Sequence, residues 1–66
     1  VFATDVLAAG DKAAGVEIPA DVNVISKYPI VVTKEATNAT AGQAFIDFVA
    51  SAAGQAILAK YGFLAP

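Results

Sequence analysis

Residues 28–33 read Tyr-Pro-Ile-Val-Val-Thr, and this stretch decides the expected fold. Its β-branched residues favour an extended backbone, and Pro29 stands near the start of the run, where a strand tolerates proline. The unbroken apolar run over residues 30–32 indicates burial on both faces, as in the sheet of an α/β protein. We therefore expect residues 28–33 to form the strongest strand of the chain, with Tyr28 as a packing residue at its edge.

Three shorter segments on the N-terminal side also have strand character. They are the apolar opening at residues 1–4, the alternating Val-Glu-Ile at 16–18 and the stretch at 22–25. Asp5 directly follows the first of them and is expected to cap a short helix over residues 6–9, which Gly10 ends. A ligand contact by Asp5 is the alternative, because open α/β sheets bind ligands in loops that follow strands. The expected fold class is therefore α/β.

Two amphipathic helices are expected in the C-terminal part. Asn38 or Thr40 can cap the first helix, and Ser51 separates it from a second helix over about residues 52–61. Gly62 suits the position after that helix, and Phe63 can pack back on its last turn. Apolar residues at spacings of three and four predict one inward-facing stripe on each helix. The stripes comprise Ala41, Ala44, Phe45, Phe48 and Val49 on the first, and Ala53, Ala56, Ile57 and Tyr61 on the second.

Composition excludes several kinds of chemistry. The chain has no cysteine and no histidine, so it has no disulfide, no zinc site of the usual type and no thiol or imidazole catalyst. Its four basic residues and net charge of −2 argue against nucleic-acid binding. Its six carboxylates share no obvious face, and its glycines form no nucleotide-binding motif. We expect no enzyme activity and no cofactor.

The chain of 66 residues contains no methionine and opens at Val1 on an apolar run. A chain this short buries only about 60% of the surface that its unfolded form exposes. We therefore expect it to be the C-terminal piece of a larger soluble protein. Its first partner would be the remainder of its own chain, and exposed edges would favour self-association when it stands alone.

The order of four motifs resembles that in a known family. They are VFATD at residues 1–5, KYPIVV at 27–32, AFIDF at 44–48 and GQAILAKYGF at 54–63. Together they resemble the C-terminal third of the molybdate-binding receptors of ABC-type importers, over nearly all 66 residues. The resemblance implies the two-lobed fold of type II periplasmic binding proteins. Residues 1–27 would then finish the second lobe, and residues 28–66 would supply a hinge-crossing strand and the C-terminal helices of the first lobe.

The resemblance also implies a function. The chain would belong to a receptor, periplasmic or membrane-anchored outside the cytoplasm, that captures molybdate or tungstate and delivers it to the importer's membrane subunits. Hydroxyl and backbone N–H groups would bind the oxyanion without a metal. Two alternatives are an anion-sensing regulatory domain of the same fold and a self-associating structural module without a ligand.

One family ligand position falls within this chain. The family's VYxxD segment provides a tyrosine whose hydroxyl donates to the anion, and Phe2 stands at the matching position here. Phenylalanine retains the ring and lacks the donor. Thr4 would share a strand face with Phe2 and is the candidate to replace the missing hydroxyl.

Overall fold

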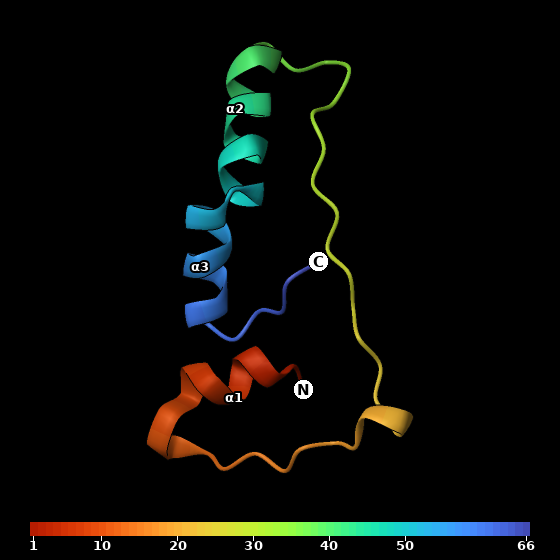
Figure 1. The fold of residues 1–66 in the computed structure, drawn as a ribbon, viewed down its shortest axis with the longest axis vertical. Helices are drawn as coiled ribbons and strands as arrows, with labels where there is room; N and C mark the ends of the chain where they lie inside the picture. The colour runs from red at the N-terminus through yellow and green to blue at the C-terminus, as the bar shows by residue number, and fades with distance from the viewer.

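Helices make up all of the regular secondary structure in the computed structural model, which describes the whole of residues 1–66. A helix α1 (Ala3–Ala9) leads into a short 3-10 helix η1 (Gly10–Lys12), and a second 3-10 turn η2 (Ala20–Val22) follows. The two longest helices, α2 (Ala39–Ala50) and α3 (Ala52–Lys60), come last. Extended or irregular chain joins these elements (Figure 1).

The prediction of an α/β fold with short strands is wrong. None of the four expected strands at residues 1–4, 16–18, 22–25 and 28–33 is present. Eighteen of the 27 backbone hydrogen bonds lie within the helices, and the other nine are in turns and caps.

The expected strand at residues 28–33 is absent because it has no neighbouring strand with which to pair. A β-branched run favours an extended backbone, but a strand also needs a neighbour to pair with its N–H and C=O groups. The backbone of residues 28–32 makes no hydrogen bond in the structure. The segment instead runs as an open, extended connection beside α2 and α3 (Figure 1).

The N-terminal helix begins earlier than expected. Residues predicted as a strand end are its first turn, and Asp5 is the third helical residue instead of the residue before the helix. Asp5 still satisfies a free donor of the first turn, because its Oδ2 accepts from the Phe2 backbone N–H at 3.0 Å. Gly10 follows the last residue of the helix, as predicted, but its φ of 57° and ψ of −128° lie outside the left-handed helical region expected for this glycine.

The two C-terminal helices are confirmed, together with the residues that cap them. The Asn38 side chain accepts from the Ala41 backbone N–H at 3.0 Å, which caps α2. Ser51 both ends α2 and caps α3, where its Oγ accepts from the Gly54 N–H at 3.2 Å. Ser51 therefore separates the two helices and caps the start of α3.

Helix α3 ends in the glycine motif that the sequence predicts. Gly62 has a φ of 93°, and its N–H donates to the Ala59 carbonyl at 3.0 Å. The Phe63 N–H reaches the Leu58 carbonyl at 3.1 Å. These two bonds turn the chain back at the end of α3 and direct the C-terminal tail toward the interior of the molecule (Figure 1).

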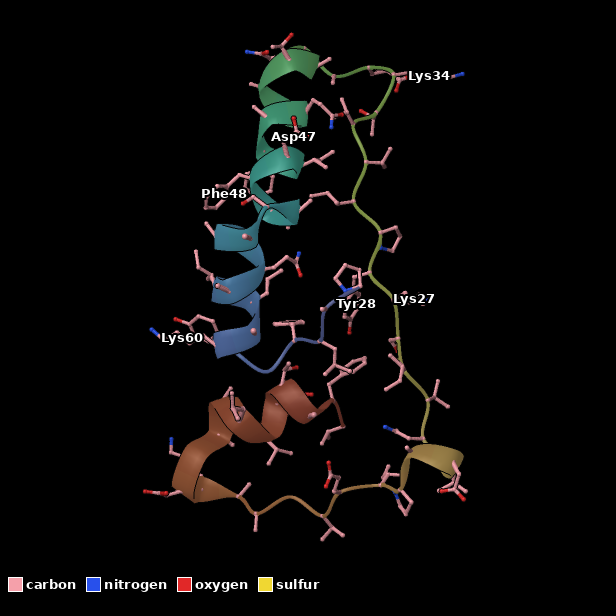
Figure 2. All side chains as sticks on the ribbon, viewed as in Figure 1. Lys27, Tyr28, Lys34, Asp47, Phe48 and Lys60 are labelled. Carbon is pink, nitrogen blue, oxygen red and sulfur yellow. The ribbon has the colours of Figure 1, made fainter.

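The inward orientation predicted for the two apolar stripes is wrong for their large side chains. Phe45 and Phe48 of α2 are 61% and 52% exposed, and Ile57 and Tyr61 at the end of α3 are 51% and 57% exposed. Figure 2 shows Phe48 pointing away from the extended segment. The partly buried residues on the side of that segment are Gly42, Ile46, Val49, Gln55 and Leu58.

The apolar surface of α2 is wider than one stripe. At about 100° per residue, its apolar positions from Ala44 through Phe45 to Ile46 cover an arc of roughly 200°. One edge of this arc meets the extended segment, where a Cβ atom on Gly42 would lie 3.1 Å from Val32 Cγ2. The remainder of the arc has no covering layer in the chain.

The elements form an open frame. Helices α2 and α3 stand end to end, α1 crosses below the end of α3, and the extended segment forms the opposite side (Figure 1). Helix α1 approaches the turn that follows α3 at Gly62, where a Cβ atom would lie 3.6 Å from the side chains of Thr4 and Leu7. Gly54 is the one buried residue of the 66. The side chains inside this frame therefore line open space.

Candidate functional site

The N-terminal turn of α1 fixes the position of Phe2. Its backbone N–H donates to Asp5 Oδ2, and its carbonyl accepts from the Asp5 N–H, both at 3.0 Å. Asp5 therefore helps to cap α1, which is the structural role that the sequence predicts for it. The Phe2 ring is 54% exposed and lies on the inner side of the frame.

Phe2 is one of three aromatic rings from distant parts of the sequence that meet around Tyr28. Its ring centroid lies 6.2 Å from that of Tyr28, with an interplanar angle of 59°. Tyr28 lies 6.4 Å from Phe63 in an edge-on arrangement at 71°. We call Phe2, Tyr28 and Phe63 the aromatic cluster. It joins the start of α1, the extended segment and the C-terminal tail, and such pairs contribute about 0.5–1.5 kcal/mol each beyond their burial.

The cluster carries one hydroxyl group, that of Tyr28. No hydrogen bond of the chain uses this hydroxyl, and the Tyr28 side chain is 65% exposed. Figure 2 shows Tyr28 on the inner side of the extended segment, close to the C-terminal tail. Tyr28 is thus packed through its ring and free at its polar end.

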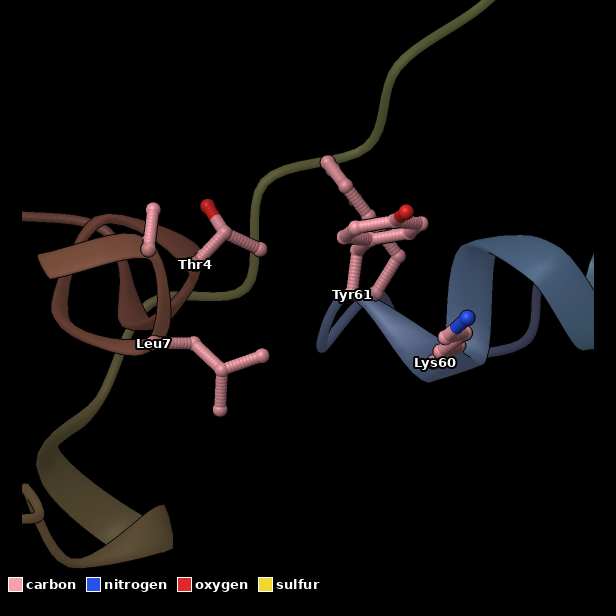
Figure 3. Close-up of a pocket in the computed structure, with 6 residues that line it drawn as sticks. Thr4, Leu7, Lys60 and Tyr61 are labelled. Atoms are coloured by element: carbon pink, nitrogen blue, oxygen red, sulfur yellow. The ribbon is translucent and has the colours of Figure 1, made fainter. Parts of the chain in front are cut away.

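Thr4 lies two residues after Phe2, in the first turn of α1, and is partly buried. It lines a small pocket of about 540 Å³ between α1 and the end of α3, together with Leu7, Ala8, Lys60, Tyr61 and Phe63. Figure 3 shows Thr4 and Leu7 extending from α1 toward Tyr61. Lys60 Nζ stands 5.8 Å from the centroid of the Tyr61 ring, within the range of a cation–π contact.

A larger groove of about 1860 Å³ fills the interior of the frame, and both Phe2 and Thr4 line it. Its wall also contains three consecutive donor side chains of the extended segment, Ser26, Lys27 and Tyr28. The volume is far above that of a small ion, so an ion would occupy only one part of the groove. The donor side chains near Phe2 and Tyr28 are therefore the candidate contacts for an anion in this groove.

The expected strand geometry does not link Phe2 to Thr4. Thr4 is helical, so the two residues do not alternate along a strand face. They are linked by Phe63, which belongs to the aromatic cluster and also lines the pocket of Thr4. Sequence reasoning treated Tyr28 as a packing residue and missed its free hydroxyl. The only sequence signals at Tyr28 were the neighbouring Pro29 and its position at the edge of an apolar run, and neither predicts a free hydroxyl.

No group of three or more His, Cys, Asp or Glu side chains lies together in a way that would hold a metal ion. No helix of the chain has the length and apolar character needed to span a membrane. The open interior and its donor side chains are the features that a binding function can use.

A protein-family model for bacterial extracellular solute-binding proteins matches residues 1–64. The chain belongs to the bacterial extracellular solute-binding proteins. Neither the curated proteins nor the solved structures yielded a match.

Membership of the bacterial extracellular solute-binding proteins gives the chain a general role. This role is that of a receptor that binds a small ligand outside the cytoplasm and works with a transporter. The family suggests a binding role for the chain and not an enzymatic one.

Proposed function

We propose that the chain is part of a receptor that captures molybdate or tungstate and delivers it to the membrane subunits of an ABC importer. The observation that carries this proposal is the match of residues 1–64 to the extracellular solute-binding family. The resemblance of the four motifs, in their order, to molybdate-binding receptors supports an oxyanion of the molybdate type as the ligand. The receptor would be periplasmic or anchored to the outer face of the membrane.

The charge of the chain is compatible with such a ligand. Its net charge is −2 with only four lysines, so capture of a dianion cannot depend on a strongly basic surface. Neutral donors held in fixed positions replace the hydration shell of an oxyanion, and each hydrogen bond to a charged ligand contributes about 1.5–3 kcal/mol. Phe2 and Thr4 are the proposed contact positions in this chain, Phe2 through its ring and Thr4 through its hydroxyl.

The open frame supports the idea that the remainder of the receptor completes the fold. Residues 1–66 bury only Gly54, and large apolar side chains of α2 and α3 face outward. We propose that residues 1–27 and residues 28–66 belong to different lobes, with the ligand between them. Most of the anion donors would then come from other parts of the receptor.

Isothermal titration calorimetry of the receptor that contains residues 1–66 tests this function. Molybdate and tungstate are expected to bind in a ratio of one per receptor, with sulfate and phosphate at least about 100-fold weaker, a difference of roughly 2.7 kcal/mol. Equal or stronger binding of sulfate would assign the receptor to another oxyanion. The lack of heat with all four anions would refute an oxyanion receptor.

A further inference from the structure

The centre of the aromatic cluster is a tyrosine with an unused donor. The Tyr28 ring pairs with both Phe2 and Phe63, at centroid distances of 6.2 and 6.4 Å. These two contacts restrict where the ring lies, while 65% of the side chain remains exposed. Its hydroxyl is therefore held in a defined region of the groove without a protein acceptor.

We propose that the Tyr28 hydroxyl donates a hydrogen bond to the bound oxyanion beside Phe2. This inference rests on the proposed function, because it assigns a donor within the same oxyanion site. Phe2 provides a ring at that place and no polar atom. The neighbouring tyrosine, 6.2 Å away between ring centroids, provides the phenolic O–H that Phe2 lacks.

The surroundings of Tyr28 are suited to an anion. Ser26 and Lys27 precede it in the same extended segment and line the same groove, and they add a hydroxyl and an ammonium donor. Thr4 lines this groove from α1. An oxyanion has acceptors only, so a wall with several donors can replace water around it.

Tyr28 is a stronger candidate than Thr4 for the donor beside Phe2. Thr4 lies on the helix and extends toward Tyr61 at the end of α3 (Figure 3). Tyr28, by contrast, is in ring contact with Phe2 itself. Its position also depends on Phe63, so the C-terminal tail takes part in orienting the donor.

The test compares two tyrosine variants of the receptor that contains this chain, by calorimetric titration with molybdate. Tyr28→Phe retains the ring contacts and removes only the hydroxyl, so we expect molybdate affinity to fall about 10- to 150-fold. Tyr61→Phe is the matched control. Tyr61 is similarly exposed at 57%, and it does not line the groove, so its affinity should equal that of the parent receptor.

A double variant tests whether the loss of affinity in Tyr28→Phe comes from the missing hydroxyl and not from an indirect effect of the substitution. Phe2→Tyr in the Tyr28→Phe background returns one phenolic donor to the neighbouring ring, and most of the lost affinity should return. Thermal unfolding of each variant, read by circular dichroism, should show the same midpoint as the parent, because no buried group changes.

The outcomes separate this inference from the proposed function. If the parent receptor binds molybdate and Tyr28→Phe binds it equally well, the donor role of Tyr28 is overturned and the receptor function stands. An equal loss in Tyr28→Phe and Tyr61→Phe would also overturn it. If the parent binds no oxyanion, both proposals fall.

Discussion

Phe2 stands where the resemblance to molybdate-binding receptors leads us to expect a tyrosine. The side chain lies in an aromatic cluster whose other members come from residues 28 and 63, so the ring has a packing role independent of any ligand. A hydroxyl at its para position would add a donor at the edge of the groove. The ring contacts themselves do not require that the hydroxyl be absent.

Phe2→Tyr in the receptor that contains this chain should therefore preserve molybdate affinity or tighten it. The added hydroxyl keeps the ring contacts and offers one more hydrogen bond, worth up to about 1.5–3 kcal/mol to a charged ligand. Calorimetric titration of the parent and the variant measures the change. A collapse of binding would show that the ring of Phe2 does not border the oxyanion.

The polar caps of the helices could be predicted from the sequence more reliably than the burial of their apolar faces. Asn38, Ser51 and Gly62 act locally, through hydrogen bonds and backbone angles within a few residues, and the structure confirms all three. Such short-range signals depend little on the rest of the fold. The bounds of α2 and α3 follow from them.

The strands and the apolar stripes depend on partners that lie far away in sequence or outside these residues. The run at residues 28–33 has the composition of a strand, yet it has no neighbour with which to pair. Phe45 and Phe48 have the spacing of a buried stripe, yet no layer covers them. The candidate site shows the same difference. A sequence motif points to Phe2, whereas Tyr28 stands out only through its ring contact with Phe2 in the structure.

The junction of α2 and α3 offers a test at this scale. Gly54 is buried, and a Cβ atom there would clash with the Phe48 carbonyl oxygen and lie 2.7 Å from that of Val49. Gly54→Ala should therefore destabilise the receptor by about 1–3 kcal/mol, because backbone atoms must move. Thermal unfolding measures the effect.

Gly42→Ala is the control for that substitution. Gly42 is also a helical glycine, but a Cβ atom there would meet only the side chain of Val32, at 3.1 Å, which can adjust. The gain in helix propensity, about 1 kcal/mol, offsets the tight contact. An equal unfolding midpoint for Gly54→Ala and Gly42→Ala would contradict the close approach at the junction.

The whole molecule is larger and more exposed than a self-sufficient domain of its mass. A folded monomer of 6.6 kDa is expected to expose roughly 3,900 Å², whereas this chain exposes 5991 Å². Its radius of gyration is 15.4 Å, against about 11 Å for a closed domain of this length. The chain therefore does not enclose a core of its own.

Residues 1–66 produced alone should be poorly stable and self-associating, and they should bind no measurable molybdate. The exposed side chains of α2 and α3 would seek other apolar surface, and most of the proposed anion donors would be missing. Sedimentation velocity and calorimetry test these two expectations. A stable, well-folded monomer would argue against a requirement for the remainder of the receptor, and micromolar binding would argue against missing donors.

We propose that the complete receptor selects molybdate or tungstate over other oxyanions. The most direct measurement is a competitive calorimetric titration, in which molybdate is added to the receptor that contains this chain in the presence of excess sulfate. We expect molybdate still to bind at one site with nearly unchanged affinity. Displacement of molybdate by sulfate, or the lack of any molybdate binding, would contradict it.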